Sequence, residues 1–98
     1  MKFYYKLHKS GSDILLAVSD MDLVGKSFSD GEVVFSVTSE FYGNSVASEK
    51  EIISFVKNAV MVNAVGKNIV SFLKDNELIA ENGAKIICGL PHAQIFVI

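Results

Sequence analysis

Apolar and polar residues alternate at the start of the chain, which predicts strands with one buried face. Phe3, Tyr5 and Leu7 share one side of the first run, and a second apolar run follows a Ser-Gly-Ser link. Such a link is typical of a tight turn because Gly11 accepts a positive φ angle. Residues 2–18 are therefore predicted to form two antiparallel strands.

Two turns and a third strand are predicted next. Ser19 or Asp20 is placed to cap a short helical turn, and Gly25 would end that turn in a left-handed conformation. A second turn at 29–31 precedes the segment 32–41, whose alternation predicts a third strand with one buried face.

Two helical patterns occupy the middle of the chain. Ser48 and Glu51 have the spacing of a capping box, so the first helix should begin there. Its apolar stripe consists of Ile52, Phe55, Val56, Ala59 and Val60. A second stripe consists of Val65, Ile69, Phe72 and Leu73. A kink or break is expected over 63–66, because glycine costs ~1 kcal/mol relative to alanine within a helix.

The end of the chain again has the pattern of strands. We predict a turn at 82–85, a short strand at 86–88, a connection at 89–91 and a final strand at 92–98. With a period of two, Ala93, Ile95 and Val97 form a core face, whereas His92, Gln94, Phe96 and Ile98 form the opposite face. Phe96 and Ile98 are expected to pack under a helix or against a partner.

These elements predict an α+β fold in a single domain covering residues 1–98. We expect two layers, with a small mixed or antiparallel sheet of about five strands and two main helices packed on one face. Half of the 98 residues are apolar and a fifth are charged, a composition typical of an ordered domain.

Composition also narrows the compartment and the partners. No apolar run approaches the ~20 residues that span a bilayer, and the N-terminal segment lacks a signal-peptide core, so we expect a cytoplasmic protein without a membrane partner. The lone cysteine fits a reducing compartment. The net charge is −2 and all nine cationic residues are lysines. Without arginine, base readout in DNA is not expected, and an RNA site would use lysine, amides and aromatic stacking.

Motifs for catalysis or metal binding are weak. "VGKS" at 24–27 resembles the end of a phosphate-binding loop, but Asp20 replaces the first glycine and a turn and strand are predicted to follow instead of a helix. Cys88 and His92 have the spacing C-x-x-x-H, which supplies too few ligands for a zinc site. A buried, inert thiol is the more common role of a lone cysteine. We therefore predict no catalytic residue, no metal and no cofactor.

Two patches remain as candidate binding residues. His92 and Gln94 begin the polar half of the last strand and could border a cleft; a hydrogen-bonded rim of the sheet is the structural alternative. Tyr42 with Gly43 could expose an aromatic ring for stacking, and packing of Phe41 and Tyr42 against the first helix is the alternative.

Four motifs together resemble a small archaeal family, domain of unknown function 424. They are "LVGKSF" (23–28), "EFYGNS" (40–45), "VNAVGKNIV" (62–70) and the most specific, "GLPHAQIFVI" (89–98). The chain departs from the pattern at Asn44, where glycine is usual, and at Cys88, where a small residue is expected. The residues that the resemblance carries over as candidate ligand-binding positions are Tyr42, Gly43, Asn63, Gly66, Gly89, Pro91, His92 and Gln94.

The leading hypothesis is a non-enzymatic binding module whose partner is RNA or a ribonucleoprotein, in keeping with a role near the translation machinery that the archaeal setting suggests. Amides and an imidazole can hydrogen-bond base edges, and aromatic rings can stack on single strands. One alternative is a small enzyme with His92 as general acid or base and Gln94 or Asn63 orienting the substrate. Another is an accessory subunit or homo-oligomer that pairs through an edge strand.

Overall fold

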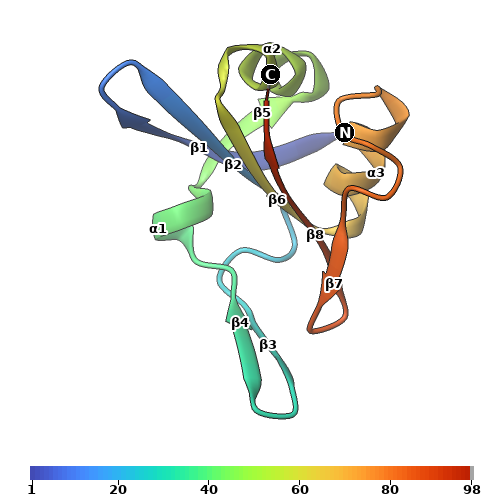
Figure 1. The fold of residues 1–98 in the computed structure, drawn as a ribbon. Coiled ribbons are helices and arrows are strands. Elements are labelled where there is room, and N and C mark those ends of the chain that lie inside the picture. Colours follow the sequence, from blue (N-terminus) through green and yellow to red (C-terminus); the bar gives the residue numbers. More distant parts are fainter. Residues whose placement is uncertain (98) are drawn as a thin grey trace.

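The computed structural model describes residues 1–97, and its main element is a mixed sheet (Figure 1). The strands of this sheet are β1 (Lys2–Ser10), β2 (Asp13–Asp20), β5 (Ser45–Ser48), β6 (Met61–Val65), β7 (Lys85–Ile87) and β8 (Leu90–Phe96). Their order is β5-β1-β2-β6-β8-β7, with β2 and β6 parallel and all other neighbours antiparallel. The α+β class is confirmed, but the main sheet has six strands instead of about five.

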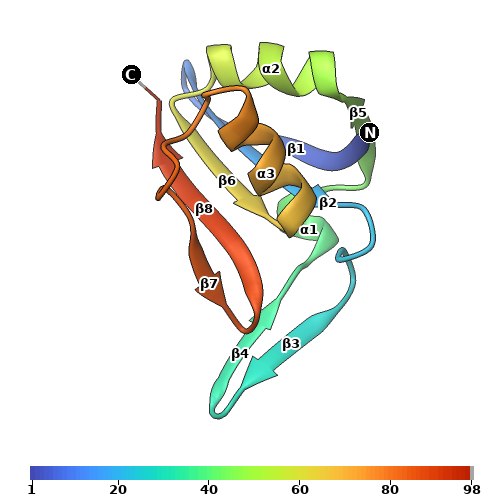
Figure 2. The ribbon, with the colours of Figure 1, turned by 90° about the vertical axis from the view of Figure 1, so that its right-hand side faces the viewer.

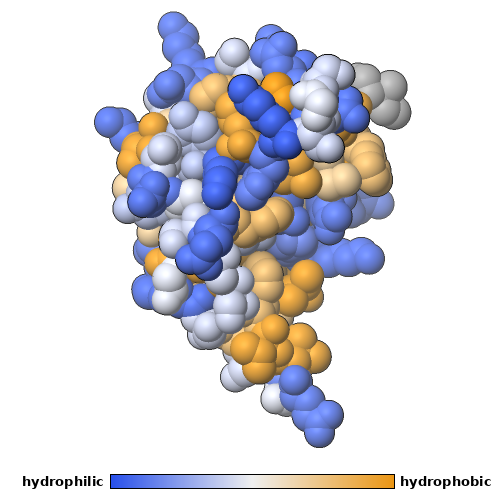
Figure 3. Space-filling model, turned by 90° about the vertical axis from the view of Figure 1, so that its left-hand side faces the viewer, coloured by the Kyte–Doolittle hydropathy of each residue, from blue (hydrophilic) through white to orange (hydrophobic). Residues whose placement is uncertain are grey.

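A separate two-stranded ribbon, β3 (Ser27–Asp30) with β4 (Val33–Ser36), projects from the body of the molecule (Figures 1 and 2). Its exposed valines, Val33 and Val34, account for apolar surface on the ribbon seen at the bottom of Figure 3. The predicted third strand over 32–41 is thus too long. The strand ends at Ser36, Val37 turns into the core, and Thr38 caps the next helix, because its side chain accepts a hydrogen bond from the Phe41 N–H.

That next helix, α1 (Ser39–Tyr42), is short, and the two longer helices follow it. They are α2 (Glu49–Asn58) and α3 (Lys67–Asp75). The predicted capping box is confirmed: the Glu51 N–H donates to Ser48 Oγ, and the Ser48 N–H donates to Glu51 Oε1. Figure 2 shows α3 against the sheet and α2 across one end of it.

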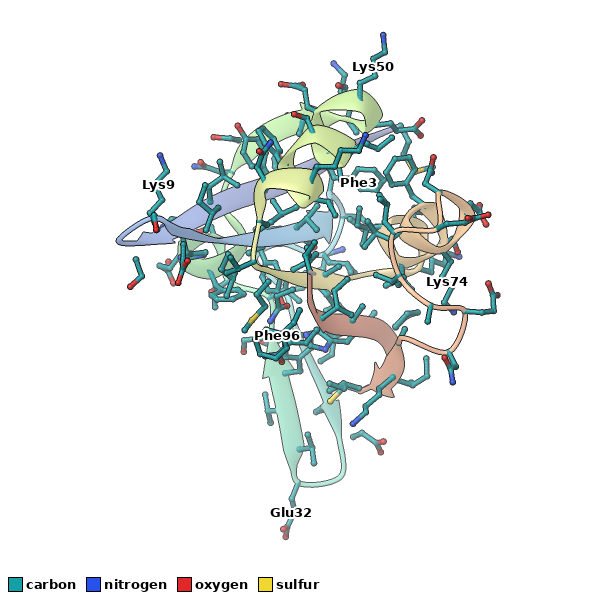
Figure 4. The ribbon with its side chains drawn as sticks, turned by 45° about the horizontal axis from the view of Figure 1, so that its top comes forward. Phe3, Lys9, Glu32, Lys50, Lys74 and Phe96 are labelled. Carbon is teal, nitrogen blue, oxygen red and sulfur yellow. The ribbon has the colours of Figure 1, made fainter. Side chains whose placement is uncertain are left out.

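Both longer helices contribute to one core on a single face of the sheet, as predicted. Phe3, Leu16 and Val18 face Ile52 of α2 and Ile69 of α3, and all five are essentially inaccessible to solvent. Phe3 also contacts Phe72, with ring centroids 5.8 Å apart, and it lies between β1 and the helices in Figure 4. Ala93, Ile95 and Val97 join this core, which confirms the predicted inner face of the last strand.

Of the kink or break predicted over 63–66, the structure has the break: residues 61–65 form β6, which pairs with β2 on one side and β8 on the other, and α3 begins after Gly66. Val62 and Ala64 face the helices, whereas Val65 is buried on the opposite face instead of belonging to a helical stripe. A central strand buried on both faces gives a nearly continuous apolar run, and that run imitates a helix. Consequently α2 ends before Ala59.

Asp20 caps a distant helix instead of a turn of its own. Strand β2 continues through Asp20, and residues 21–25 form a turn in which Gly25 has φ 90°, the left-handed conformation that was predicted. The two carboxylate oxygens of Asp20 accept the Asn68 N–H at 3.0 Å and the Ile69 N–H at 2.8 Å. These N–H groups lie in the first turn of α3 and have no partner within that helix, so Asp20 anchors α3 to β2.

The opposite face of the sheet, called the second face below, is partly covered as well. Leu23, Val37 and Tyr42 pack there against Ala17 and Val65. The two-layer arrangement is therefore not confirmed, because α1 and the segment 21–37 cover part of the second face. In the described residues 1–97, none of the helices is long and apolar enough to cross a membrane.

Candidate functional site

The strand register groups the side chains of the second face into three rows. Directly paired residues share a face of the sheet. The first row is Ser19, Val65, His92 and Lys85; the second is Ala17, Asn63 and Gln94; the third is His8, Leu15, Met61 and Phe96. Helix α1 and the segment 21–37 pack over the first two rows, while Gln94 and Phe96 are exposed.

Three residues that lie far apart in the sequence meet under this cover. Asn63 Oδ1 accepts a hydrogen bond from the Tyr42 hydroxyl at 2.7 Å and lies 3.0 Å from Nε2 of His92. Because an amide oxygen only accepts, His92 must carry its proton on Nε2. The Nδ1 atom of His92 has no partner among residues 1–97 and is not buried, so it is an acceptor open to solvent.

Burial keeps both of Asn63's partners uncharged at neutral pH. It lowers the pKa of the His92 imidazole and raises the pKa of the Tyr42 phenol to about 12. Phe35 of the β3–β4 ribbon contributes to the burial of His92, with its ring edge-on at a centroid distance of 5.7 Å. His92 therefore sits in a fixed orientation with a fixed tautomer.

Tyr42 does not present its ring to a ligand. Its side chain is only 3% exposed, which contradicts the idea of an exposed stacking tyrosine. Helix α1 is tied to β1 by Lys6 Nζ, which donates to the Glu40 carbonyl at 2.8 Å, and by His8 Nε2, which donates to the Phe41 carbonyl at 2.7 Å. These bonds satisfy carbonyls that a helix C-terminus leaves free.

Gly43 and Gly66 are required where backbones approach closely. Gly43 has φ 77°, and a Cβ there would lie 2.2 Å from the carbonyl oxygen of Tyr5. Gly66 has φ 120°, and a Cβ there would lie 2.3 Å from Cγ of Asp20. The "FYG" and "AVG" motifs are thus explained by the seating of α1 and α3 on the sheet.

Gly89 and Pro91 shape the β7–β8 hairpin. Cys88 and Gly89 both have positive φ, 51° and 80°, which makes them a two-residue turn of the kind that joins twisted strands. The Pro91 carbonyl accepts the Gly66 N–H at 2.9 Å. The expected buried thiol is only partly buried: Cys88 Sγ lies 3.6 Å from the Val33 carbonyl oxygen. The described residues contain no cluster of three or more side chains suited to a metal ion.

A groove with a volume of about 350 Å³ lies beside this network. It is lined by Gly83, Lys85, Ile87, His92, Gln94 and Phe96. Phe96 is 75% exposed and lies on the side of β8 away from α3 (Figure 4), so the expectation that it packs under a helix is wrong. Ile98, expected to accompany it, lies outside the described residues.

The structure thus divides the predicted site residues into two groups. Tyr42, Asn63 and His92 converge in one network, and His92 with Gln94 also lines the groove. Gly43, Gly66, Gly89 and Pro91 serve the backbone around them. Sequence reasoning missed Lys85, which is placed in the groove only by its pairing with His92 across the hairpin.

Comparison with known proteins supports the fold and the family. A model of the family described as proteins of unknown function, DUF424, matches residues 8–98. A crystal structure of an uncharacterized conserved protein from Methanopyrus kandleri resembles the chain with a TM-score of 0.84 and 23% identity, covering 100% of this chain and 93% of that one. At that identity the likeness establishes the fold alone. No curated protein matches the chain.

Proposed function

Because this chain belongs to the DUF424 family, whose description names no activity, we propose its function from the site itself: it binds single-stranded RNA on the open part of the second face. The groove beside β8 is the observation that carries the proposal. It combines an exposed aromatic ring, an amide and a lysine, which are the three kinds of group that hold a single strand.

Phe96 is the proposed stacking platform. A ring that is 75% exposed on a β-strand contributes little to the core, yet either of its faces can accept a nucleobase. Stacking on an aromatic side chain is worth about 1–3 kcal/mol per base and tolerates every base. We therefore expect affinity for single strands with modest sequence preference.

Gln94 and His92 supply hydrogen bonds, and Lys85 supplies charge. The Gln94 amide can both donate and accept, and His92 Nδ1 adds a fixed acceptor in the same groove. In the part of the chain that the structure describes, one ion pair is present, and it joins the N-terminal amine to Glu49. Lys85 therefore has no carboxylate within salt-bridge distance among these residues. Its ammonium group is thus available for a phosphate despite the net charge of −2.

The enzyme alternative gains no support from the groove. A His92 general acid or base would be strengthened by a carboxylate in the same groove, and the described lining residues include neither Asp nor Glu. Its Nε2 is already occupied by Asn63.

The test is fluorescence anisotropy with a labelled, unstructured RNA oligonucleotide at low salt. F96A should lose about 1–3 kcal/mol of binding free energy, which is about a fivefold to 150-fold loss of affinity. The matched control is I86A: Ile86 is 69% exposed on the same hairpin but belongs to the other face of the sheet. I86A should bind as the wild type does.

Lysine substitutions test the electrostatic part. K85Q should flatten the dependence of log affinity on log salt by about 0.7, the value of one phosphate contact with a single strand. The control is K50Q, because Lys50 lies on α2 far from Phe96 (Figure 4). Absence of RNA binding by the wild type at low salt, or equal affinities for F96A and I86A, would refute the proposal.

A further inference from the structure

Strand β1 is longer than the strand that covers its outer edge. It spans nine residues, and β5 pairs only with residues 2–5 of it. Strand β5 begins at Ser45, opposite Tyr5, and the residues just before it belong to α1 and its link to the sheet. Residues 6–10 therefore form an edge of the main sheet that no other strand covers in the described part of the chain.

The hydrogen bonds of β2 show which backbone groups of this edge are free. The Ile14 carbonyl accepts the Val60 N–H at 2.8 Å, so it points to the β6 side, and Ile14 pairs with Lys9 across the antiparallel β1–β2 ladder. In such a ladder, directly opposite residues alternate between pairs that exchange hydrogen bonds and pairs that do not. The N–H and C=O of Lys9 therefore point away from β2, and so do those of Leu7, two residues before it.

A groove runs along these free groups. Its volume is about 490 Å³, and it is lined by Tyr5 to Leu7 and Lys9 of β1, by the start of α1 and by residues 43–45. Equivalent groups two residues apart in a strand repeat every 6.8 Å or so, which is also the repeat of another extended polypeptide. The groove thus has the place and the hydrogen-bonding pattern for one more strand in line with β5.

The side chains of the groove carry an excess of positive charge. Lys6 and Lys9 are both exposed, and Lys9 lies at the hairpin end of β1 (Figure 4). Lys6 Nζ donates to the uncharged Glu40 carbonyl, and neither lysine has a carboxylate within salt-bridge distance among residues 1–97. Between them Leu7 is half-buried against the core under the helices. A strand on this edge would thus meet an apolar side chain between two cations.

We propose that this edge of β1 binds an extended acidic segment of a partner protein, which adds to the main sheet as a strand antiparallel to β1. An acidic residue of the segment lies opposite Lys9, an apolar residue two positions later lies opposite Leu7, and a second acidic residue follows opposite Lys6. Strands β2 and β6 separate β1 from β8, so this surface is distinct from the groove at Phe96. The inference does not depend on RNA binding.

The same two lysines disfavour a second copy of this chain as the occupant. Two β1 edges joined through the free groups of Leu7 and Lys9 would bring four lysines into one short stretch, Lys6 and Lys9 from each copy. Like charges on neighbouring strands oppose pairing, and lysine on an exposed edge protects against edge-to-edge association. The lysines therefore discriminate between a copy of this chain and an acidic segment.

The first experiment measures fluorescence anisotropy of a labelled, end-capped peptide, Thr-Glu-Thr-Val-Glu-Thr, with the wild-type protein at low salt. Replacing both glutamates by lysine should weaken binding at least about tenfold. N-methylation of the first glutamate and the valine, whose N–H groups would face β1, should also weaken it at least about tenfold. The matched control is the peptide N-methylated at the threonine between them, because that N–H would point away from β1. The control should bind as the unmodified peptide does.

Variants at Lys9 separate backbone pairing from charge. K9P removes the outward N–H at a position where a sheet edge tolerates proline, whereas K9Q keeps that N–H and removes only the charge. K9P should bind the peptide at least about fivefold more weakly than K9Q. K9E should reverse the preference between glutamate and lysine at the first acidic position of the peptide. F96A should bind this peptide as the wild type does.

Amide hydrogen exchange followed by NMR tests the wild type directly. In the free protein the amides of Leu7 and Lys9 should exchange faster than that of His8, whose N–H points to β2. Saturation with the peptide should slow the exchange of Leu7 and Lys9 and leave that of His8 unchanged.

Four results would overturn the proposal. They are no binding of the peptide at millimolar concentration, an equal loss of affinity for both N-methylated peptides, and slow exchange of Leu7 and Lys9 in a protein that sedimentation shows to self-associate. The fourth is protection of these two amides by an RNA oligonucleotide and not by the peptide. None of these results bears on RNA binding at Phe96 except the last, which would move the RNA site to β1.

Discussion

Replacing Asn63 by leucine, a residue of similar size, removes the acceptor that Tyr42 and His92 share. The Tyr42 hydroxyl is almost fully buried, and a buried hydroxyl without a partner costs about 1–3 kcal/mol. The His92 bond is partly exposed and adds less. We expect N63L to lower the free energy of unfolding by about 2 kcal/mol in total, which corresponds to a melting temperature lower by roughly 8–16 °C for a domain of this size.

A double-mutant cycle with Y42F tests the physical reason. Y42F removes the hydroxyl, so N63L in that background no longer strands a buried donor and should cost about 1 kcal/mol less than in the wild type. Thermal unfolding followed by circular dichroism measures all four proteins. If N63L lowers the free energy of unfolding equally in both backgrounds, the 2.7 Å hydrogen bond between Tyr42 and Asn63 does not stabilise the fold.

Three further predictions concern the frame of the site. G43A should lower the free energy of unfolding by more than about 2 kcal/mol, because its Cβ meets the Tyr5 backbone. G11A, at φ 61° in open space, should lower it by only about 1–2 kcal/mol, and urea unfolding measures both variants. Burial raises the folded-state pKa of Asp20, so its contribution to stability is full below about pH 3.8 and is lost as pH rises through the folded-state value. D20N lacks this pH dependence, so the difference in unfolding free energy between wild type and D20N should fall as pH rises through that range. C88N should raise the melting temperature, because asparagine tolerates φ 51° better than cysteine; an unchanged value would contradict this.

Short-range sequence patterns predicted those elements whose conformation is set by residues close together in the chain. The β1–β2 hairpin follows from alternation and a glycine turn, and the start of α2 follows from Ser48 and Glu51. The last strand was assigned to the correct faces because a period of two needs no tertiary information.

Tertiary structure decided the remaining elements. Strand β6 was missed, and its residues were read as a kinked or broken link between two helical patterns, because a parallel neighbour and helices on one face make almost every position apolar. The cap of α3 could not be predicted, because Asp20 is 48 residues before Asn68. The hydrogen-bond network of Asn63 could not be predicted for the same reason, since Asn63 lies 21 residues from Tyr42 and 29 from His92 in the sequence.

The positions that carry the family resemblance therefore explain how the fold is held together better than they explain what its surface binds. Gly43 and Gly66 are fixed by atoms 2.2 Å and 2.3 Å from a hypothetical Cβ, so this chain needs them for its fold whatever it binds. His92 contributes both to the fold and to the surface: its Nε2 donates to Asn63, and its Nδ1 faces solvent. Phe96 and Lys85 gain nothing from the frame, because an exposed ring and an unpaired lysine add little to stability. Ligand recognition is thus best sought in these two exposed residues, beside the motif histidine that lies in the same groove.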